Sequence, residues 1–195
     1  MTSKLTKPEL PEGFAYFPNL ISFQKGLDLY EHLTGDLQWQ QPSIQVFGKY
    51  HPIPRLQSFV ADEGVHYAYS NHQLANQSWT KPLAAMRSKL QSHYNQPFNA
   101  LLLNWYRDGH DTMGWHSDDE AELGAEPLII SISLGAARKF KIKHKTTGQQ
   151  WELMLEHGSC LVMSGNSQQL FQHSLPKQSK VKGGRINLTF RSIVK

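Results

Sequence analysis

The sequence predicts an α+β fold that is mainly β, with two helices packed on the outside of an antiparallel core. Apolar runs of strand length recur after residue 97, and Gly, Pro or polar clusters separate them. Only two earlier segments show the apolar spacing of an amphipathic helix. Short strands at this spacing are typical of a β-sandwich or a small barrel.

The two predicted helices lie in the first half of the chain. Ser22 can cap a helix that runs to about Leu33. Its apolar side chains recur at helical spacing and are expected to share one face: Phe23, Leu27, Tyr30 and Leu33. A second helix opens at Thr80-Lys81-Pro82, where proline is tolerated in the first turn, and runs to about His93.

The rest of the chain is expected to form an arm, short strands and loops. Residues 1–13 are polar and rich in proline, which predicts a flexible arm before a single domain over residues 14–195. Residues 38–80 are rich in aromatic residues, Gly and Pro. The strands after residue 97 are expected at 98–105, 128–134, 139–142, 151–155, 159–163, 170–173 and 185–194.

Composition limits the classes of function only broadly. The 195 residues carry 20 Lys and Arg against 16 Asp and Glu, so the net charge of +4 permits a polyanionic partner without requiring one. A lone cysteine, Cys160, excludes an internal disulfide. No apolar stretch reaches the length of a membrane span, and Met1-Thr2-Ser3-Lys4 leads into no apolar segment like that of a secretion signal. We therefore expect a cytoplasmic monomer that does not enter a membrane.

A metal site is predicted around the tetrapeptide Trp115-His116-Ser117-Asp118. Side chains two apart on an extended stretch point the same way, so His116 and Asp118 can reach one ion. His173, at the end of a strand-like run, is the best third ligand. Two His and one carboxylate form the facial triad that leaves positions open on iron. An H-x-D tripeptide also arises by chance, and zinc hydrolysis competes, although H-E-x-x-H and C-x-x-C are both missing from the sequence.

The segment from Arg185 to Arg191 alternates strictly between polar and apolar residues. On a strand, Arg185, Asn187, Thr189 and Arg191 share one face. Two arginines facing a protein interior need anionic partners, and 2-oxoglutarate offers two carboxylates. A surface strand with solvated arginines is the alternative. Asn104 and Tyr106, two apart on an earlier strand, can also hydrogen-bond a carboxylate.

Taken in order, these motifs resemble the AlkB family of Fe(II)- and 2-oxoglutarate-dependent dioxygenases, over about residues 40–193. The resemblance implies a double-stranded β-helix (jelly roll), with a nucleotide-recognition lid at about 38–80 and a catalytic core at about 97–195. It implies Fe(II) ligation by His116, Asp118 and His173. Arg185 would pair with the distal carboxylate of 2-oxoglutarate, helped by Tyr106 and Asn187, and Arg191 with the end near the metal, with Asn104 nearby; Thr189 lies on the same face.

The resemblance also implies oxidative removal of alkyl groups from bases such as 1-methyladenine and 3-methylcytosine, with O₂ as cosubstrate. Phe47 resembles a finger that enters the base stack, which favours double-stranded DNA, although single-stranded DNA and RNA stay open. The other residues expected to contact nucleic acid are Arg55, Tyr67, Tyr69, Asp119 and Glu120. Two alternatives remain: an oxygenase acting on a protein or small molecule, and a non-catalytic nucleic-acid-binding jelly roll.

Overall fold

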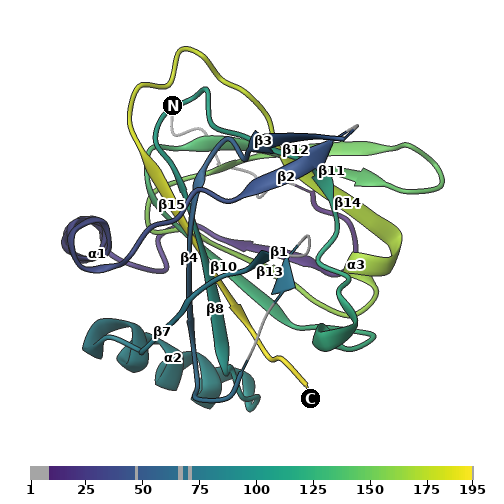
Figure 1. Cartoon of the computed structure of the whole chain (residues 1–195). Helices are drawn as coiled ribbons and strands as arrows, with labels where there is room; N and C mark the ends of the chain where they lie inside the picture. The colour runs from purple at the N-terminus through teal and green to yellow at the C-terminus, as the bar shows by residue number, and fades with distance from the viewer. Residues whose placement is uncertain (1–8, 47, 66–67, 70–71, 195) are drawn as a thin grey trace, which may run out of the picture.

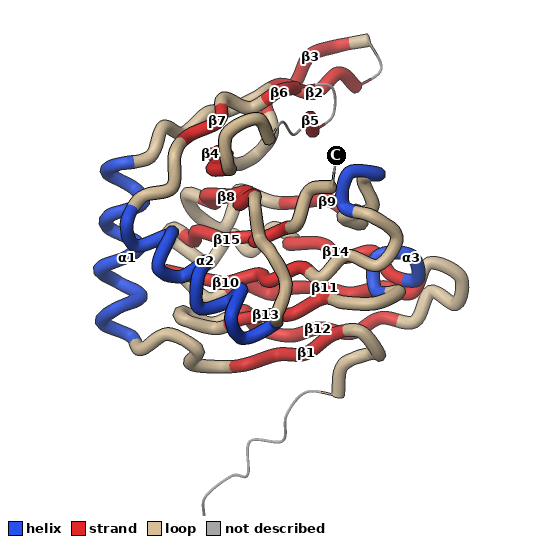
Figure 2. Tube along the Cα trace, turned by 90° about the horizontal axis from the view of Figure 1, so that it is seen from below, coloured by secondary structure: helices blue, strands red, loops and turns tan. Residues whose placement is uncertain are grey.

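The computed structural model describes residues 9–46, 48–65, 68–69 and 72–194, and two sheets form its main part (Figures 1 and 2). The larger sheet has seven strands in the order β1 (Phe14–Phe17), β13 (Cys160–Met163), β10 (Ile129–Gly135), β15 (Arg185–Arg191), β8 (Ala100–Tyr106), β4 (Leu56–Ala61) and β7 (Asn76–Gln77). The smaller sheet has the order β12 (Gln150–Leu155), β11 (Arg138–His144), β14 (Phe171–Leu175) and β9 (Met113–His116). All neighbouring strands are antiparallel except β4 and β7.

Four shorter elements flank the two sheets. The hairpins β2 (Ser43–Val46) with β3 (Lys49–Pro52) and β5 (Ala68–Tyr69) with β6 (His72–Gln73) lie beside the end of the larger sheet that carries β4 (Figure 2). The 3-10 helix η1 (Ala121–Leu123) follows β9, and the single-turn helix α3 (Ser167–Leu170) precedes β14. The whole arrangement is the jelly roll expected from the sequence.

Alternation along the strands creates two separate apolar layers. Ile186, Leu188 and Phe190 of β15 pack in a fully buried cluster with α1 (Phe23–Asp36) and α2 (Lys81–Tyr94), which cover the outer face of the larger sheet (Figure 1). A second cluster, with Ile129 from one sheet and Phe140 from the other, fills the space between the sheets. The polar residues of β15 face this inner space, as the sequence predicted.

Helix α1 differs from the expectation in its length and in its buried face. It runs three residues past Leu33, to Asp36, and buries Gly26, Leu29 and Leu33. Phe23, expected on the buried face, is 70% exposed. The buried face of α1 includes Gly26 because the ring of His157 packs against it. A Cβ on Gly26 would lie only 2.4 Å from His157 Nε2.

The larger sheet takes strands from both sides of residue 97, where the core was expected to begin. Strands β1, β4 and β7 all precede it and belong to the larger sheet. Part of the predicted arm is also packed, because the backbone N–H of Ser164 donates to Gly13 O at 2.9 Å. The two main sheets therefore combine strands from the first half of the chain with strands that follow residue 97. Within the described residues, neither long helix has the length and apolar character to cross a membrane.

Candidate active site

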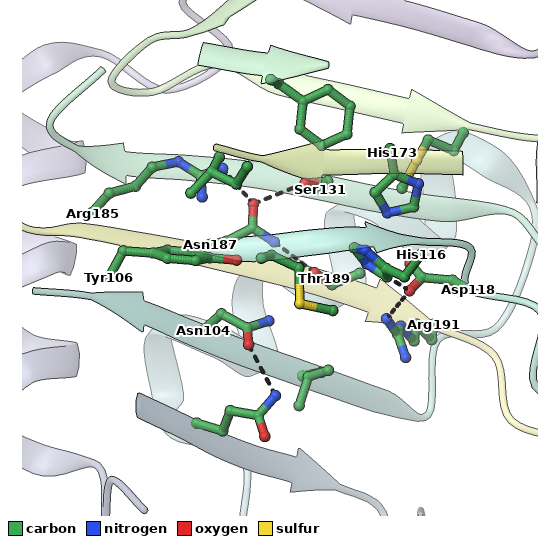
Figure 3. A pocket seen from close by; sticks show the side chains of 16 residues that line it. Asn104, Tyr106, His116, Asp118, Ser131, His173, Arg185, Asn187, Thr189 and Arg191 are labelled. Carbon is green, nitrogen blue, oxygen red and sulfur yellow. Dashed lines mark hydrogen bonds and ion pairs between the residues drawn. The ribbon is translucent and has the colours of Figure 1, made fainter. Parts of the chain in front are cut away.

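Three side chains predicted as metal ligands converge between the two sheets. His116, at the end of β9, pairs in register with His173 on the neighbouring strand β14, and Asp118 lies just beyond β9. Ligand atoms of the three residues all lie within 4.8 Å of one another. His116 Nε2 is 3.7 Å from Asp118 Oδ1, and the two imidazole centroids are 4.2 Å apart (Figure 3). The spacing suits two nitrogens and one oxygen around a single ion.

Each imidazole is held in a form that can bind a metal. His116 Nδ1 lies 3.0 Å from Gly114 O; a carbonyl only accepts, so Nδ1 carries the proton and Nε2 keeps a free lone pair. His173 is buried against the ring of Phe140. Burial, reinforced by the nearby His116, lowers the pKa of His173 to about 3. The ring is therefore neutral at pH 7, as metal ligation requires.

Asp118 is a buried carboxylate whose charge is matched inside the protein. Its Oδ1 lies 2.9 Å from Arg191 Nη2, and both side chains are 5% exposed. Burial alone would raise the pKa of Asp118, but the positive charge of Arg191 and the neighbouring His173 and His116 outweigh it and hold the pKa below its usual range. The backbone N–H of Asp118 donates to Gln168 Oε1 at 2.9 Å, which fixes the chain beyond β9.

Arg185 lies at the opposite end of the polar face of β15, where it is only 2% exposed (Figure 3). Its Nη2 donates to Ser133 Oγ at 2.8 Å and to Asn187 Oδ1 at 2.7 Å. The guanidinium carbon is 5.4 Å from the centroid of the Tyr106 ring. The surface-strand alternative is therefore wrong, because both arginines of β15 are buried.

The remaining polar residues of the cavity form a connected network. Asn187 Nδ2 donates to Thr189 Oγ1 at 2.7 Å, and Ser131 Oγ donates to Asn187 Oδ1 at 2.9 Å. Asn104 also lines the cavity, but it pairs in register with Asn187 rather than lying beside Arg191. The expected place of Asn104 near Arg191 is thus corrected, because β8 runs antiparallel to β15.

The residues present fit a metal ion and an anionic cosubstrate. His173 Nδ1 and Arg185 Nε are buried and have no hydrogen-bond partner among the described residues. Buried polar atoms without partners are rare in folded proteins and indicate a missing ligand or water. One of these atoms belongs to the predicted metal site and the other to the predicted carboxylate site.

Three residues expected to contact nucleic acid lie in the part of the chain that the structure describes in full: Arg55, Asp119 and Glu120. Arg55 is buried (4% exposed), and its Nε donates to Asn104 Oδ1 at 2.9 Å, so it is not available to phosphate. Asp119 is exposed and lies 3.5 Å from Lys145 Nζ. Neither Asp119 nor Glu120, at the start of η1, is among the described residues that line the cavity. A contact of these two carboxylates with a cationic base stays a prediction.

The other residues expected to contact nucleic acid are Phe47, Tyr67 and Tyr69. Phe47 and Tyr67 lie outside the described residues. Tyr69 belongs to β5 and pairs with His72, but only its backbone is described. On either side of Phe47, Val46 and Lys49 form the last pair of the β2–β3 hairpin, and Gly48 has a φ of +79°.

Several residues of the site were missed by the sequence analysis. They line the cavity or support its members and are Gln57, Met113, Ser131, Ser133, Phe140, Gln168 and Arg138. Ser131 and Ser133 left a signal, because they interrupt an isoleucine run with period two. The others left none, since distant segments of the chain bring them to the site.

Comparison with known proteins agrees with the family that the sequence motifs resemble. The family described as the 2OG-Fe(II) oxygenase superfamily matches residues 13–191. The chain is 38% identical over 172 residues to the human protein named DNA oxidative demethylase ALKBH2, covering 84% of this chain and 64% of that protein. The bovine protein of the same name is also 38% identical, with 84% and 60% covered. The mouse protein named alpha-ketoglutarate-dependent dioxygenase alkB homolog 3 is 33% identical, with 91% and 65% covered.

These matches leave part of each relative uncovered, since the chain spans about three fifths to two thirds of their lengths. Among solved structures, one described as OsALKBH1 superposes with a TM-score of 0.70 at 17% identity, covering 94% of this chain and 99% of that one. A structural likeness at this identity supports the fold alone.

Proposed function

The chain belongs to the 2OG-Fe(II) oxygenase superfamily, and from this premise we propose that it removes alkyl groups oxidatively from bases in DNA. The observation that carries the proposal is the convergence of His116, Asp118 and His173 at one end of a cavity that holds Arg185 at the other. Relatives named DNA oxidative demethylase support the substrate class.

Fe(II) would be held by His116 Nε2, the Asp118 carboxylate and a ring nitrogen of His173. With 2-oxoglutarate and O₂, the bound iron supplies oxidation of the alkyl carbon, and a hydroxylated methyl group leaves as formaldehyde beside succinate and CO₂. Carboxylate oxygens of 2-oxoglutarate would accept from Arg185 and Arg191, because guanidinium forks match carboxylates. The position of Arg191 beside Asp118 favours Arg191 for the end near the metal.

The protein itself binds, orients and shields the reactants. Arg191 keeps Asp118 ionised, and the low pKa of His173 keeps that ring unprotonated. Tyr106 and Phe140 are both at least nine-tenths buried and line the cavity, so they restrict the entry of water. A base cannot reach this depth inside a duplex, so it must be flipped out or already unpaired.

We propose N-alkylated bases such as 1-methyladenine and 3-methylcytosine as substrates. Their methyl groups lie on the Watson–Crick edge, which a flipped base presents to the pocket that reads it. Tyr67 and Tyr69 are proposed to stack on the flipped ring. The test is a panel of methylated DNA and RNA oligonucleotides with Fe(II) and 2-oxoglutarate, scored by mass and by formaldehyde. Formaldehyde from DNA supports the proposal, and its absence from every DNA substrate would contradict it.

A preference for double-stranded DNA is also proposed. In the sequence, Phe47 stands between Val46 and Gly48 at the β2–β3 connection, and a Cβ on Gly48 would meet nothing within 4 Å. We propose that Phe47 serves as an apolar wedge that enters the base stack. Phe47→Ala should then slow repair of duplex more than repair of single strands. An equal loss on both substrates would refute the wedge, and Tyr50→Ala, which removes an exposed aromatic side chain from β3, is the control.

A further inference from the structure

Arg138 is a charged side chain that the proposed mechanism does not use. It begins β11, is completely buried (0% exposed), and is not among the described residues that line the cavity. Burial lowers its pKa, although nearby Tyr106, Asp111 and Asp108 act in the opposite direction. A buried guanidinium is costly unless hydrogen bonds compensate it, so its contacts should explain its position.

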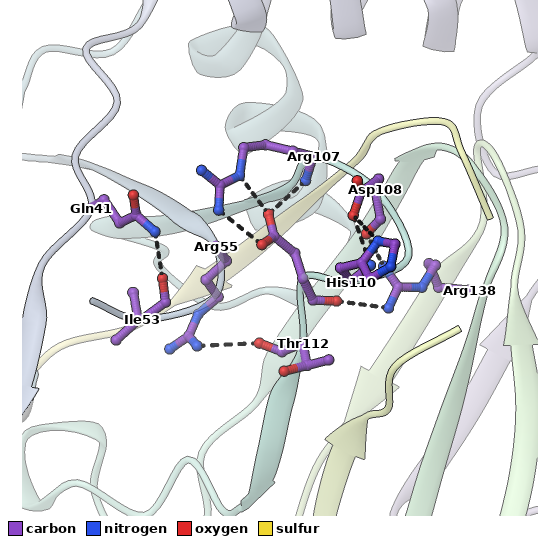
Figure 4. Close-up of polar contacts among 9 residues, drawn as sticks. Gln41, Ile53, Arg55, Arg107, Asp108, His110, Thr112 and Arg138 are labelled. Carbon is purple, nitrogen blue, oxygen red and sulfur yellow. Dashed lines mark hydrogen bonds and ion pairs between the residues drawn. The ribbon is translucent and has the colours of Figure 1, made fainter. Parts of the chain in front are cut away.

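The contacts of Arg138 join two loops, and Figure 4 shows Arg138 beside the first of them, with Asp108 and His110. Its Nη1 donates to Asp108 O at 2.8 Å, and its Nη2 donates to Asp111 O at 2.8 Å and to Pro176 O at 2.9 Å. Its Nε lies 3.3 Å from Gln178 Oε1. One planar guanidinium therefore donates to backbone carbonyls in two loops. We call residues 107–112 the first loop and residues 176–184 the second loop.

Both loops lead directly into the site. The first loop enters β9, which ends at the metal ligand His116, and the second loop joins the strand of His173 to the strand of Arg185. The loops also bind each other. The N–H of Gly109 donates to Val181 O at 2.9 Å, and a Cβ on Gly109 would lie 1.9 Å from Gln178 O. Their separation is therefore fixed closely.

Arg138 also supports the cosubstrate end of the cavity. Its guanidinium carbon lies 5.8 Å from the centroid of the Tyr106 ring, and that of Arg185 lies 5.4 Å from the same ring. Tyr106 thus contacts both guanidinium groups, and Arg138 limits the movement of the ring beside Arg185.

We propose that Arg138 is a positioning residue, which cross-links the two loops and so holds the metal ligands and the 2-oxoglutarate site in register before either ligand binds. The inference rests on the proposed function. The fork is the essential feature, because a lysine ammonium is a point charge that cannot reach the same carbonyls in one plane. Replacing groups that orient metal ligands typically changes metal affinity or activity about 10–100-fold, and we expect a change of the same order for 2-oxoglutarate, which would bind the same site.

The test is calorimetric titration of 2-oxoglutarate into protein loaded with Mn(II), which permits binding without turnover. Arg138→Lys and Arg138→Met should both raise the Kd for 2-oxoglutarate about 10–100-fold, with normal stoichiometry in the folded fraction. A purely structural role would instead lower the folded fraction and the stoichiometry while leaving the Kd unchanged, and that result would overturn the proposal. Arg87→Met removes a guanidinium from the distant helix α2 and should leave the Kd unchanged.

Gly109→Ala decides the question if the Arg138 variants fail to fold, because it separates the same loops without removing charge. It should also raise the Kd, whereas Gly35→Ala, whose Cβ would meet nothing within 4 Å, should not. An unchanged Kd in Gly109→Ala would overturn the proposal. Failure of the wild-type protein to bind 2-oxoglutarate would instead reject the proposed function, whereas normal wild-type binding with unaffected variants rejects only the role of Arg138.

Discussion

Replacement of Arg185 should weaken the binding of 2-oxoglutarate without stabilising the ligand-free protein. In Arg185→Met, an apolar chain replaces a guanidinium that is 2% exposed. Burial lowers the pKa of Arg185 from its ordinary 12.5 to about 10. Each pKa unit corresponds to about 1.4 kcal/mol, so the charge costs the ligand-free protein about 3 kcal/mol. Because a depressed pKa penalises the protonated form, the cost is present in full below about pH 10.

The substitution also removes two hydrogen bonds. Ser133 Oγ and Asn187 Oδ1 lose the charged donor that lies 2.8 and 2.7 Å away, at about 1.5–3 kcal/mol each. Asn187 Oδ1 keeps its second donor, Ser131 Oγ. The two lost bonds, about 3–6 kcal/mol together, therefore equal or exceed the relieved cost of burial, so the Tm of the ligand-free variant should stay the same or fall by up to about 6–12 °C.

Binding of 2-oxoglutarate to Arg185→Met should weaken at the same time. Two hydrogen bonds from a charged donor contribute about 1.5–3 kcal/mol each, so the Kd should rise by about 10²–10⁴-fold. Thermal unfolding with and without 2-oxoglutarate, together with calorimetry in Mn(II), measures both quantities. Saturating ligand should raise the Tm of the wild type but not of the variant. A higher Tm of the variant without ligand, or an unchanged Kd, would refute the reasoning.

Three further predictions concern the metal, the packing of α1 and the acid limit of stability. His116→Ala should weaken Mn(II) binding by more than the roughly 100-fold of an outer-shell change and abolish turnover; wild-type turnover would contradict its role as a ligand. Gly26→Ala should cost about 2 kcal/mol in urea unfolding, because the new Cβ displaces His157 from two hydrogen bonds, and a stable variant would contradict this packing. Burial raises the pKa of Asp111, but its bonds to Arg107 outweigh burial and lower it. The carboxylate therefore stabilises the fold above about pH 4 and loses this effect as pH falls through its lowered pKa. Asp111→Asn should be less stable than wild type at pH 7, with the difference narrowing as pH falls below about 4 and through the lowered pKa of Asp111; a constant difference would argue against the ion pair.

The parts of the site that could be predicted are those with a local signature. Alternation in Arg185–Arg191 gave the strand and its two faces, because side chains on a strand have period two. The H-x-D spacing predicted that His116 and Asp118 act together, and the ordered resemblance added His173. The structure confirms their convergence, since β9 and β14 pair at the two histidines.

The parts that could not be predicted depend on contacts between distant segments. Arg55 has the sequence appearance of a surface charge, yet Asn104, 49 residues away, accepts its hydrogen bond inside the protein. Arg138 is similar, with partners 27 to 40 residues away. Strand β4 joins the larger sheet through β8, although its sequence neighbours belong to small hairpins. Tertiary packing decided each of these positions, and local propensity carries no information about it.

The central place of β15, between β10 and β8, limits how this protein can vary in length. Inserting or deleting a single residue inside the strand would exchange its faces beyond that point, placing Arg191 under the helices and Phe190 in the cavity. The apolar layer under the helices and the polar lining of the cavity would then both be disrupted. The exposed turn at residues 145–149, between β11 and β12, belongs to neither the apolar layer nor the cavity. Peptide tags and grafted loops are therefore best placed in that turn.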